Sequence, residues 1–500
     1  MQHIHLKIEP KLDKRLQAFA YQAEAVNAVR DLDFAAVFHE QGLGKTKIAL
    51  DIILYWLETR VIDTALLIVK KGLVANWVKE IKTHTYITPR LITQDRRANY
   101  YAFNSPARLM LTHYEAMKAE RERFRLFLKA RSVGVILDES AKIKNPESEV
   151  TEVLFDLASL MKKRVIMTGT PVANRPYDIW AQIWFLDQGK ALGQDFGEFK
   201  SSVELTNDLW DDLPAQQKLE KKLDGIFKKI ASFCVRETKA SGVITLPDKV
   251  IESIPAIWET RQCELYRQLR DDLHAVVVKE GVPKEENAES ILKRLLRLVQ
   301  VASNPKLVDE SYNANPGKLE VVIDLVGRIR DAGEKCIVWT SFTENVDWLS
   351  RELRVHGTCR IHGKLTMEER NKSVERFLSA EDCRVLIATP GAAKEGLTLT
   401  VANHVIFYDR SFSLDDYLQA QDRIHRISQK KTCHVYNLIM KNSIDEWVDI
   451  LLRSKQLAAQ LTQGDISLEF YKSQMSYEFG DVLRGILGID CRNKGERNER

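Results

Sequence analysis

The chain has 500 residues, with 74 Lys and Arg against 70 Asp and Glu, so its formal net charge is only +4. With 44% hydrophobic and 29% charged residues it has the composition of a globular protein, and its length corresponds to about two to four domains. No apolar run approaches the roughly 18 residues of a membrane span, and residues 1–5 lack the pattern of a secretion signal. The seven cysteines include no C-x-x-C pair, which argues against a zinc site and favours the reducing cytoplasm.

Short β-branched strands alternate with helical segments in two series, and the region between them, from about Tyr177 to Val308, is mostly helical. Continuous apolar strands separated by helices are typical of a parallel sheet covered on both faces. We therefore predict an α/β fold with two parallel-sheet lobes and helical insertions. The predicted strands are Phe34–Phe38, Ala65–Lys70, Arg108–Thr112, Val133–Leu137 and Arg164–Met167 in the first series, and Cys336–Thr340, Cys359–His362, Arg384–Ala388, His404–Tyr408 and Cys433–Ile439 in the second.

A glycine-rich segment follows the first predicted strand and precedes an apolar-periodic helix. Gly42 and Gly44 would let backbone N–H groups close on phosphate oxygens at the positive end of that helix. Lys45 could then reach the β- and γ-phosphates, and the Thr46 hydroxyl could bind magnesium. The P-loop pattern requires glycine where this chain has His39, so a glycine turn that merely starts a helix is the alternative.

The strand Val133–Leu137 leads directly into two carboxylates, Asp138 and Glu139. In a nucleoside triphosphatase, Asp138 would hold magnesium and Glu139 would orient and deprotonate the attacking water. An acidic pair after a strand can also cap a helix, but the glycine loop upstream favours the catalytic interpretation. The next strand ends in Thr168–Pro171, which either senses the γ-phosphate or is a plain strand-to-loop turn.

Two side chains and two polar stretches in the helical region are predicted to be structural. Trp180 and Trp184 are four residues apart, so we interpret them as packing residues on one helix face. Lys279–Ser290 and Asp309–Lys318 are predicted to be exposed loops or linkers.

The second lobe contains an arginine pair, Arg423 and Arg426, which would share one face if the segment were helical. The planar guanidinium spreads positive charge over several oxygens, so arginine is suited to a phosphoryl group in transfer. The alternative is a surface pair that bridges to Asp422 or Asp416.

In this order the motifs resemble those of the Swi/Snf-type ATPases, the double-stranded-DNA translocase branch of helicase superfamily two. The resemblance covers about residues 12–455, with two departures. Thr398 stands where typical remodellers carry Asn, as in annealing-helicase and bacterial or phage members, and Ser140-Ala141 stands where the family commonly has Ala-His. The matching segments are Tyr21-Gln22, Gly42–Thr46, Leu66–Trp77, Asp138–Asn145, Thr168–Asn174, Arg236, Lys239, Leu246–Lys249, Leu296-Arg297, Ser303–Pro305, Ile361–Gly363, Arg370, Gly391–Gly396 and Gln419–Gln429.

The resemblance implies two RecA-like lobes with helical protrusions, ATP bound between them and duplex DNA lying across both. It implies that Gln22 reads the adenine and that Arg423 and Arg426 act as arginine fingers. The family's DNA contacts correspond loosely to Lys71, the region of Thr112, and Thr389. The implied cofactors are ATP and Mg²⁺.

The same resemblance suggests a domain division. We expect lobe 1 at residues 1–250, with a helical protrusion at about 177–240, and a second protrusion and linker at 251–317. Lobe 2 would occupy 318–465, followed by a C-terminal tail at 466–500.

The leading hypothesis is therefore a motor that hydrolyses ATP on duplex DNA and translocates along it, either remodelling protein–DNA complexes or reannealing strands. Its partners would be double-stranded DNA and a targeting protein or DNA-bound protein substrate, with no membrane. A strand-separating DNA or RNA helicase is the second hypothesis. The third, motivated by Ser140-Ala141, is a degenerate motor that serves as a DNA-binding scaffold.

Overall fold

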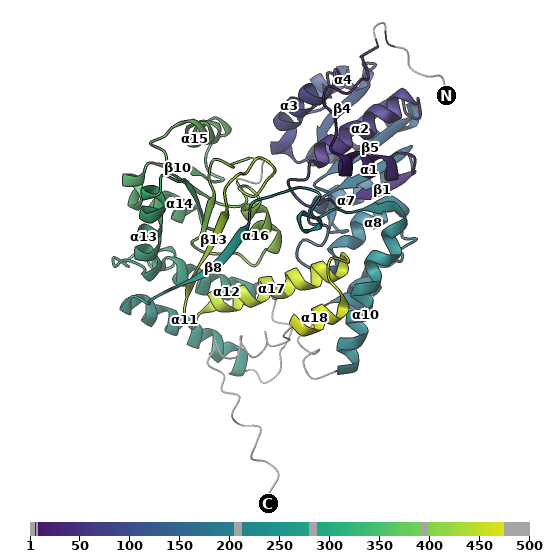
Figure 1. Ribbon diagram of the computed structural model, residues 1–500. Coiled ribbons are helices and arrows are strands. Elements are labelled where there is room, and N and C mark those ends of the chain that lie inside the picture. The colour runs from purple at the N-terminus through teal and green to yellow at the C-terminus, as the bar shows by residue number, and fades with distance from the viewer. Residues whose placement is uncertain (1–5, 7–8, 205–212, 280–287, 393–397, 475–500) are drawn as a thin grey trace, which may run out of the picture. The chain divides into compact units, whose positions relative to one another are not determined.

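The computed structural model describes residues 6, 9–204, 213–279, 288–392 and 398–474. The chain divides into two compact units, each built on one β-sheet (Figure 1). The lobe and linker boundaries at residues 250, 317 and 465 stay predictions, and the predicted tail lies outside the described residues from 475 onward. The first unit consists of Met1–Leu205, Pro214–Thr245 and Ala458–Lys472, and the second of Thr206–Leu213, Leu246–Leu457 and Ser473–Arg500.

The sheet of the first unit has seven parallel strands among the described residues. They are β1 (Phe34–Val37), β2 (Thr64–Val69), β3 (Arg90–Leu91), β4 (Leu109–His113), β5 (Val133–Asp138), β6 (Lys163–Met167) and β7 (Cys234–Val235). Their order is β3-β4-β2-β5-β6-β1-β7, and every residue of β2 and β5 is buried. All five strands predicted for this lobe are present. The two edge strands β3 and β7, each two residues long, are too short to leave a pattern in the sequence.

The first unit also contains α-helices, some of which pack on this sheet. They are α1 (Ala20–Val29), α2 (Lys45–Glu58), α3 (Val74–His84), α4 (Arg96–Asn104), α5 (Tyr114–Ala119), α6 (Arg121–Ala130), α7 (Glu149–Ala158), α8 (Trp180–Asp187), α9 (Phe196–Val203), α10 (Leu213–Ile230) and α18 (Leu468–Gln474). One core cluster joins Ile48, Ile52 and Trp56 of α2 to apolar residues of β1 and β2. The helix that starts at Lys45 is thus fixed against the sheet by about ten buried side chains along its length.

The predicted tryptophan pair is confirmed as packing. Trp180 is 4% exposed, its ring centroid lies 6.3 Å from that of Trp184, and both rings contact Phe155 of α7. This aromatic cluster attaches α8 to the first unit.

The sheet of the second unit has six parallel strands among the described residues. They are β8 (Lys249–Ala256), β9 (Cys336–Trp339), β10 (Thr358–Ile361), β11 (Val385–Ala388), β12 (His404–Phe407) and β13 (Cys433–Met440), in the order β10-β11-β9-β12-β13-β8. Its helices are α11 (Thr260–Lys279), α12 (Ala288–Ser303), α13 (Gly317–Asp331), α14 (Thr343–Glu352), α15 (Met367–Ser379) and α16 (Leu414–Gln421), while α17 (Ile444–Thr462) continues into residues counted with the first unit. The predicted fold class, two parallel-sheet lobes with helical insertions, is confirmed.

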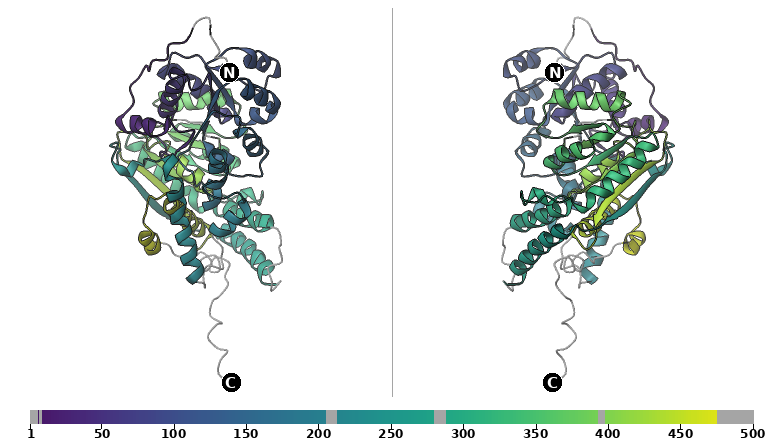
Figure 2. Two further views of the ribbon diagram at one scale, coloured as in Figure 1. Left: turned by 90° about the vertical axis from the view of Figure 1, so that its right-hand side faces the viewer. Right: turned by 90° about the vertical axis from the view of Figure 1, so that its left-hand side faces the viewer.

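The edge strand β8 is the one long strand that the sequence analysis missed. It runs beside β13 over its full length (Figure 2), from Lys249 opposite Cys433 to Ala256 opposite Met440. Four consecutive residues of β8 are exposed, and Pro255 sits near its end. Neither a buried apolar run nor a clean alternation is therefore present, and proline is tolerated because the strand lies at an edge.

The predicted exposed loop Asp309–Lys318 ends in a residue that is completely buried. Lys318 is 0% exposed, with its Nζ 2.7 Å from Asp445 Oδ2 and donating to the Tyr408 carbonyl at 3.0 Å. A buried ammonium group requires such pairing, so Lys318 fixes the start of α13 in the core. The prediction was wrong at this end because the acidic partner is distant in the sequence. The other predicted loop, Lys279–Ser290, contains residues 280–287, which lie outside the described residues.

Candidate functional site

The carboxyl ends of three neighbouring strands bring the predicted ATP-site segments to one edge of the first sheet. In the parallel register Val37 of β1 lies beside Met167 of β6, and Asp138 of β5 lies on the other side of Met167. The glycine loop follows β1, the Thr168–Pro171 loop follows β6, and Asp138 ends β5. This edge is where ligands bind in parallel α/β sheets.

The glycine loop has the backbone conformation that its glycines permit. Gly42 and Gly44 have φ values of 87° and 71°, and Gly44 is the residue that precedes the first turn of α2. The Lys45 ammonium lies inside the loop, where it donates to the carbonyls of His39 at 2.9 Å and Glu40 at 3.4 Å. Thr46, in the first turn of α2, is half-buried. The glycine loop, the first turn of α2 and the Lys45 ammonium group therefore lie next to one another.

His39 does not disrupt the loop, although the P-loop pattern has glycine at this position. His39 is not among the residues with positive φ, so its backbone does not require glycine. Its side chain is 2% exposed, and burial, helped by the Lys45 charge, lowers its pKa to about 4. The imidazole is thus neutral near pH 7 and adds no charge beside Lys45.

The predicted adenine-reading glutamine is held against the same loop. Gln22 Nε2 donates to the Leu43 carbonyl at 3.3 Å, and the neighbouring Tyr21 hydroxyl donates to that carbonyl at 3.0 Å. A Cβ atom at Gly44 would lie 2.3 Å from Gln22 Nε2, so the close approach depends on glycine there. Gln22 is 3% exposed.

Asp138 is a buried carboxylate with two hydrogen-bond donors. Trp77 Nε1 of α3 donates to Oδ2 at 2.8 Å, and the Glu139 amide donates to Oδ1 at 3.0 Å. Burial, with a smaller contribution from the nearby Glu139 charge, raises the pKa of Asp138 to about 6, while the Lys45 and Lys70 charges act in the opposite direction. Trp77 lies within a segment that carried the family resemblance, but its contact with Asp138 could not be read from its sequence position.

Glu139 occupies a left-handed backbone conformation with φ 53°, which costs a non-glycine residue on the order of 1–3 kcal/mol. Its Oε2 lies 3.8 Å from Lys70 Nζ at the end of β2. The next side chain, Ser140, donates to Gln182 of α8 at 2.8 Å. Gln182 was not identified from the sequence, although a glutamine within an apolar helix was a usable signal.

The Thr168–Pro171 loop contacts the glycine loop directly. A Cβ atom at Gly169 would lie 2.6 Å from Gln41 Cγ and 3.2 Å from Lys45 Nζ. Only glycine therefore fits here. Because the contact is so close, a movement of the loop would displace the Lys45 side chain.

In the second unit the arginine pair lies on a turn after α16, so the condition of a shared helix face is not met. Arg423 is 4% exposed, and its carbonyl accepts from the Leu399 amide at 3.0 Å. Arg426 is half-buried; its Nε donates to the Asp422 carbonyl at 2.9 Å and its Nη1 to Thr398 Oγ1 at 2.8 Å. The turn is thus attached to the segment that begins at Thr398, while Gly396 lies outside the described residues.

The three predicted DNA contacts differ in accessibility. Lys71 is exposed and donates to Gln94 at 3.3 Å, and Thr389, which follows β11, is 9% exposed. Thr112 is 0% exposed and donates to the Ile92 carbonyl at 3.2 Å, so its own side chain offers no surface to DNA. A contact in this region would have to come from its neighbours.

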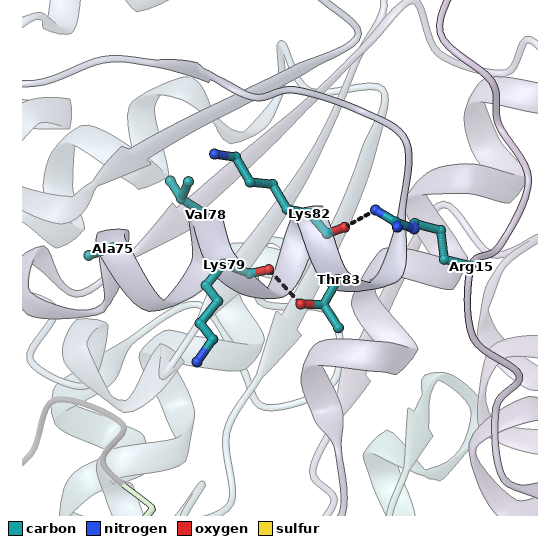
Figure 3. Close-up of a pocket in the computed structure, with 6 residues that line it drawn as sticks. All are labelled: Arg15, Ala75, Val78, Lys79, Lys82 and Thr83. Atoms are coloured by element: carbon teal, nitrogen blue, oxygen red, sulfur yellow. Dashed lines mark hydrogen bonds between the residues drawn. The ribbon is translucent and has the colours of Figure 1, made fainter. Parts of the chain in front are cut away.

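A basic hollow of about 580 Å³ lies on α3, the helix that follows Lys71 (Figure 3). Arg15 donates to the Lys82 carbonyl at 2.7 Å, and Thr83 donates to the Lys79 carbonyl at 2.9 Å. The side chains of Lys79 and Lys82 extend to opposite sides of the helix (Figure 3), so they do not converge on one small anion. Such a spread of positive charge suits an extended polyanion better.

The chain matches the model of the SNF2-related domain over residues 21–307 and that of the helicase conserved C-terminal domain over residues 317–428. The chain belongs to the SNF2-related family. Members of this family are ATP-hydrolysing enzymes of helicase superfamily two.

Similar proteins include YwqA of Bacillus subtilis, which is named as an ATP-dependent helicase/translocase. It is 29% identical over 488 residues, which cover 92% of this chain and 50% of that protein. The ISWI chromatin-remodeling complex ATPase ISW2 of Saccharomyces cerevisiae is 26% identical over 431 residues, 82% of this chain and 37% of that protein. The chain therefore spans half or less of the length of these relatives. The SWI2/SNF2 ATPase core of Sulfolobus solfataricus, solved with dsDNA, aligns over 96% of this chain and 99% of its own with 22% identity and a TM-score of 0.41.

Proposed function

We propose that this protein is a motor that hydrolyses ATP when it binds duplex DNA and uses that energy to move along the duplex. The observation that carries the proposal is the gathering of Lys45, Asp138 and Glu139 with the Thr168–Pro171 loop at one edge of the first sheet. A glycine loop at a helix N-terminus binds phosphates, and a buried carboxylate followed by a second one completes a triphosphatase site.

The glycine loop supplies most of the proposed ATP contacts. The amides around Gly42 and Gly44 bind phosphate oxygens, and Lys45 exchanges its loop carbonyls for the β- and γ-phosphates. Gln22, attached to Leu43, is positioned to read the adenine. Phosphate binding and base recognition are thus linked through a single loop.

Thr46 and Asp138 are the proposed magnesium ligands. Burial raises the pKa of Asp138 to about 6, and a divalent cation beside it would stabilise the ionised form, so the residues fit such an ion. No cluster of three or more His, Cys, Asp or Glu suited to a metal occurs in the part of the chain that the structure describes. Mg²⁺ takes most of its ligands from water and substrate phosphates, so one or two protein ligands suffice for it. Bound magnesium would neutralise charge on the phosphates during hydrolysis.

Glu139 is the proposed general base. Its carboxylate follows Asp138, and its Oε2 lies 3.8 Å from Lys70 Nζ. Arg423 and Arg426 are proposed to supply positive charge to the γ-phosphate as it leaves. The hydrogen bonds of Arg426 to Asp422 and Thr398 keep its guanidinium in a defined orientation.

The proposed DNA surface includes Lys71, Thr389 and the basic hollow on α3. Support for duplex DNA as the substrate comes from membership of the SNF2-related family and from a relative that is the ATPase of a chromatin-remodeling complex. Remodelling of DNA-bound protein, reannealing of strands and recruitment by a targeting protein are the finer proposals that follow.

The decisive experiment measures ATP turnover of the purified chain with no nucleic acid and with equal concentrations of duplex DNA, single-stranded DNA and RNA. We expect duplex DNA to stimulate turnover most, and stimulation to decline as salt rises because phosphate contacts release counterions. Displacement of a triplex-forming strand from the duplex then reports translocation. An absence of stimulation by duplex DNA would refute the proposal, and efficient displacement of a strand from a tailed duplex would favour the strand-separating helicase instead.

A further inference from the structure

Gln182 is a completely buried polar residue in the mostly apolar helix α8. It is 0% exposed, and its neighbours Ala181 and Ile183 are also 0% exposed. Its Nε2 donates to the carbonyls of Pro171 at 2.7 Å and Asp178 at 2.9 Å, and its Oε1 accepts from Ser140 at 2.8 Å. A methionine of similar length would fill this space without any polar requirement. Packing alone therefore does not require the Gln182 amide, whose contribution is these three hydrogen bonds.

The two ends of the Gln182 amide join two segments of the proposed ATP site. Ser140 directly follows Glu139, and Pro171 ends the Thr168–Pro171 loop. These segments follow the adjacent strands β5 and β6, and Gln182 is hydrogen-bonded to both of them. The glutamine is thus a bridge from one segment to the other.

The bridge lies next to a residue with an uncommon backbone conformation. Glu139 has a φ of 53°, a conformation that persists in a non-glycine residue only when its surroundings hold it. On one side its amide donates to Asp138 Oδ1 at 3.0 Å. On the other side Ser140 is held by Gln182. Loss of the second attachment would leave the backbone free to relax and would reorient the Glu139 carboxylate.

The other end of the bridge leads to the phosphate-binding loop. Gly169 packs so closely on Gln41 and Lys45 that a Cβ atom there would lie 3.2 Å from Lys45 Nζ. A change in the phosphate site that moves this loop would therefore move Pro171 and, through Gln182, the turn that carries Glu139.

We propose that Gln182, together with Ser140, is a positioning residue that orients Glu139 and couples its orientation to the Thr168–Pro171 loop. This inference rests on the role of Glu139 as general base proposed above. Gln182 acts through Glu139 and needs no contact of its own with ATP.

The test compares Gln182→Met, which removes all three hydrogen bonds at similar side-chain length, with the matched control Gln194→Met, an exposed glutamine of the same unit. Steady-state turnover is measured with saturating duplex DNA, and thermal melting is recorded for each variant. We expect Gln182→Met to lower kcat by about 10- to 100-fold, as misorientation of a catalytic group does, with the KM for ATP changed less than about threefold. Gln194→Met should behave as the unchanged protein does.

A second comparison separates positioning from general damage. In a Glu139→Gln background, single-turnover hydrolysis should show no further loss on adding Gln182→Met, because the group that Gln182 orients is already disabled. If Gln182→Met does not fold, Ser140→Ala carries the same test, with an expected fall in kcat of about 3- to 10-fold that also vanishes in the Glu139→Gln background.

The inference is overturned if a folded Gln182→Met or Ser140→Ala keeps kcat within twofold, or if the loss is equally large in the Glu139→Gln background. Failure of the proposed base would look different, because Glu139→Gln alone would then retain turnover.

Discussion

The proposed ATP site of the first unit and the arginine turn of the second unit are held in place in different ways. In the first unit Lys45, Asp138 and Glu139 lie at the ends of neighbouring strands of one sheet, and their side chains or backbones are fixed by hydrogen bonds within that unit. In the second unit Arg426 lies on an irregular turn, and it donates hydrogen bonds to the Asp422 carbonyl of that turn and to Thr398. The first arrangement is fixed by a sheet edge and the second by a loop-to-loop attachment.

This difference suggests a division of labour. Lys45 and Asp138, which are fixed at a sheet edge, can bind the ground state of ATP because they are in place before it arrives. A guanidinium on a turn is better suited to contribute when the phosphoryl group is in transfer, since only interactions that strengthen in the transition state accelerate the chemistry. The following substitutions test whether binding and catalysis separate in this way.

Lys45→Ala should have the largest effect. It removes the positive charge from the glycine loop, so both ATP affinity and turnover should fall, with hydrolysis reduced to background. ATP binding by titration calorimetry and turnover with duplex DNA measure the two effects. Lys129→Ala, an exposed lysine on α6, is the control. Near-normal turnover by a folded Lys45→Ala protein would refute the assignment of the ATP site.

Arg426→Ala should cut turnover by about 10³-fold or more, the range for arginine fingers, while ATP affinity changes much less. Arg426→Lys should rescue poorly because a point charge cannot reproduce the guanidinium fork. Turnover with saturating duplex DNA and the affinity for ATP are measured for each variant.

Two controls make this result interpretable. Thr398→Val removes the hydrogen bond that Arg426 donates but keeps the arginine, and Arg354→Ala removes an exposed arginine of the same unit. We expect Arg354→Ala to retain activity, and Thr398→Val to lose much less than Arg426→Ala because the Asp422 carbonyl still holds the guanidinium. If Arg426→Ala stays within a few-fold of the unchanged protein, the finger assignment and the proposed division of labour are wrong.

Glu139→Gln should lower turnover by about 10²–10⁴-fold, because the amide cannot accept a proton from water. ATP binding should persist, and the protein should remain on DNA in the ATP-bound state. Filter binding with labelled duplex in the presence of ATP measures this. Loss of ATP binding would instead mean that Glu139 maintains the structure of the site.

The strands and the order of the motifs could be predicted from the sequence because both depend on local patterns. All ten predicted strands are present, since most of them are short apolar runs that a parallel sheet buries. The edge strand β8 and the burial of Lys318 could not be predicted, because they depend on the neighbour β13 and on the partner Asp445.

The same limit applies to the site. The glycine loop and the Asp138-Glu139 pair are contiguous motifs, so they were visible. The contacts of Trp77 with Asp138 and of Gln182 with Ser140 join segments that only the fold brings together. Sequence patterns thus identify the groups that act on ATP, and tertiary contacts decide how those groups are oriented.

Asp138→Asn should have only a modest effect on the stability of the fold, and the size of that effect depends on pH. Because the pKa of Asp138 is raised to about 6, its carboxyl stabilises the fold while protonated, and this contribution is lost as pH rises from about 4 through 6. Asparagine does not titrate. The melting temperature of the Asp138→Asn protein minus that of the unchanged protein should therefore rise across this interval, by on the order of 5 °C. Melting is measured from about pH 4.5 to 7.5 without nucleotide or divalent cations, and groups common to both proteins cancel in the difference. The same variant should lose ATP turnover at every pH, because the proposed magnesium ligand is gone. A melting difference that does not change with pH would show that Asp138 is already ionised at low pH, and that the sheet edge holds its charge without any need for a bound cation.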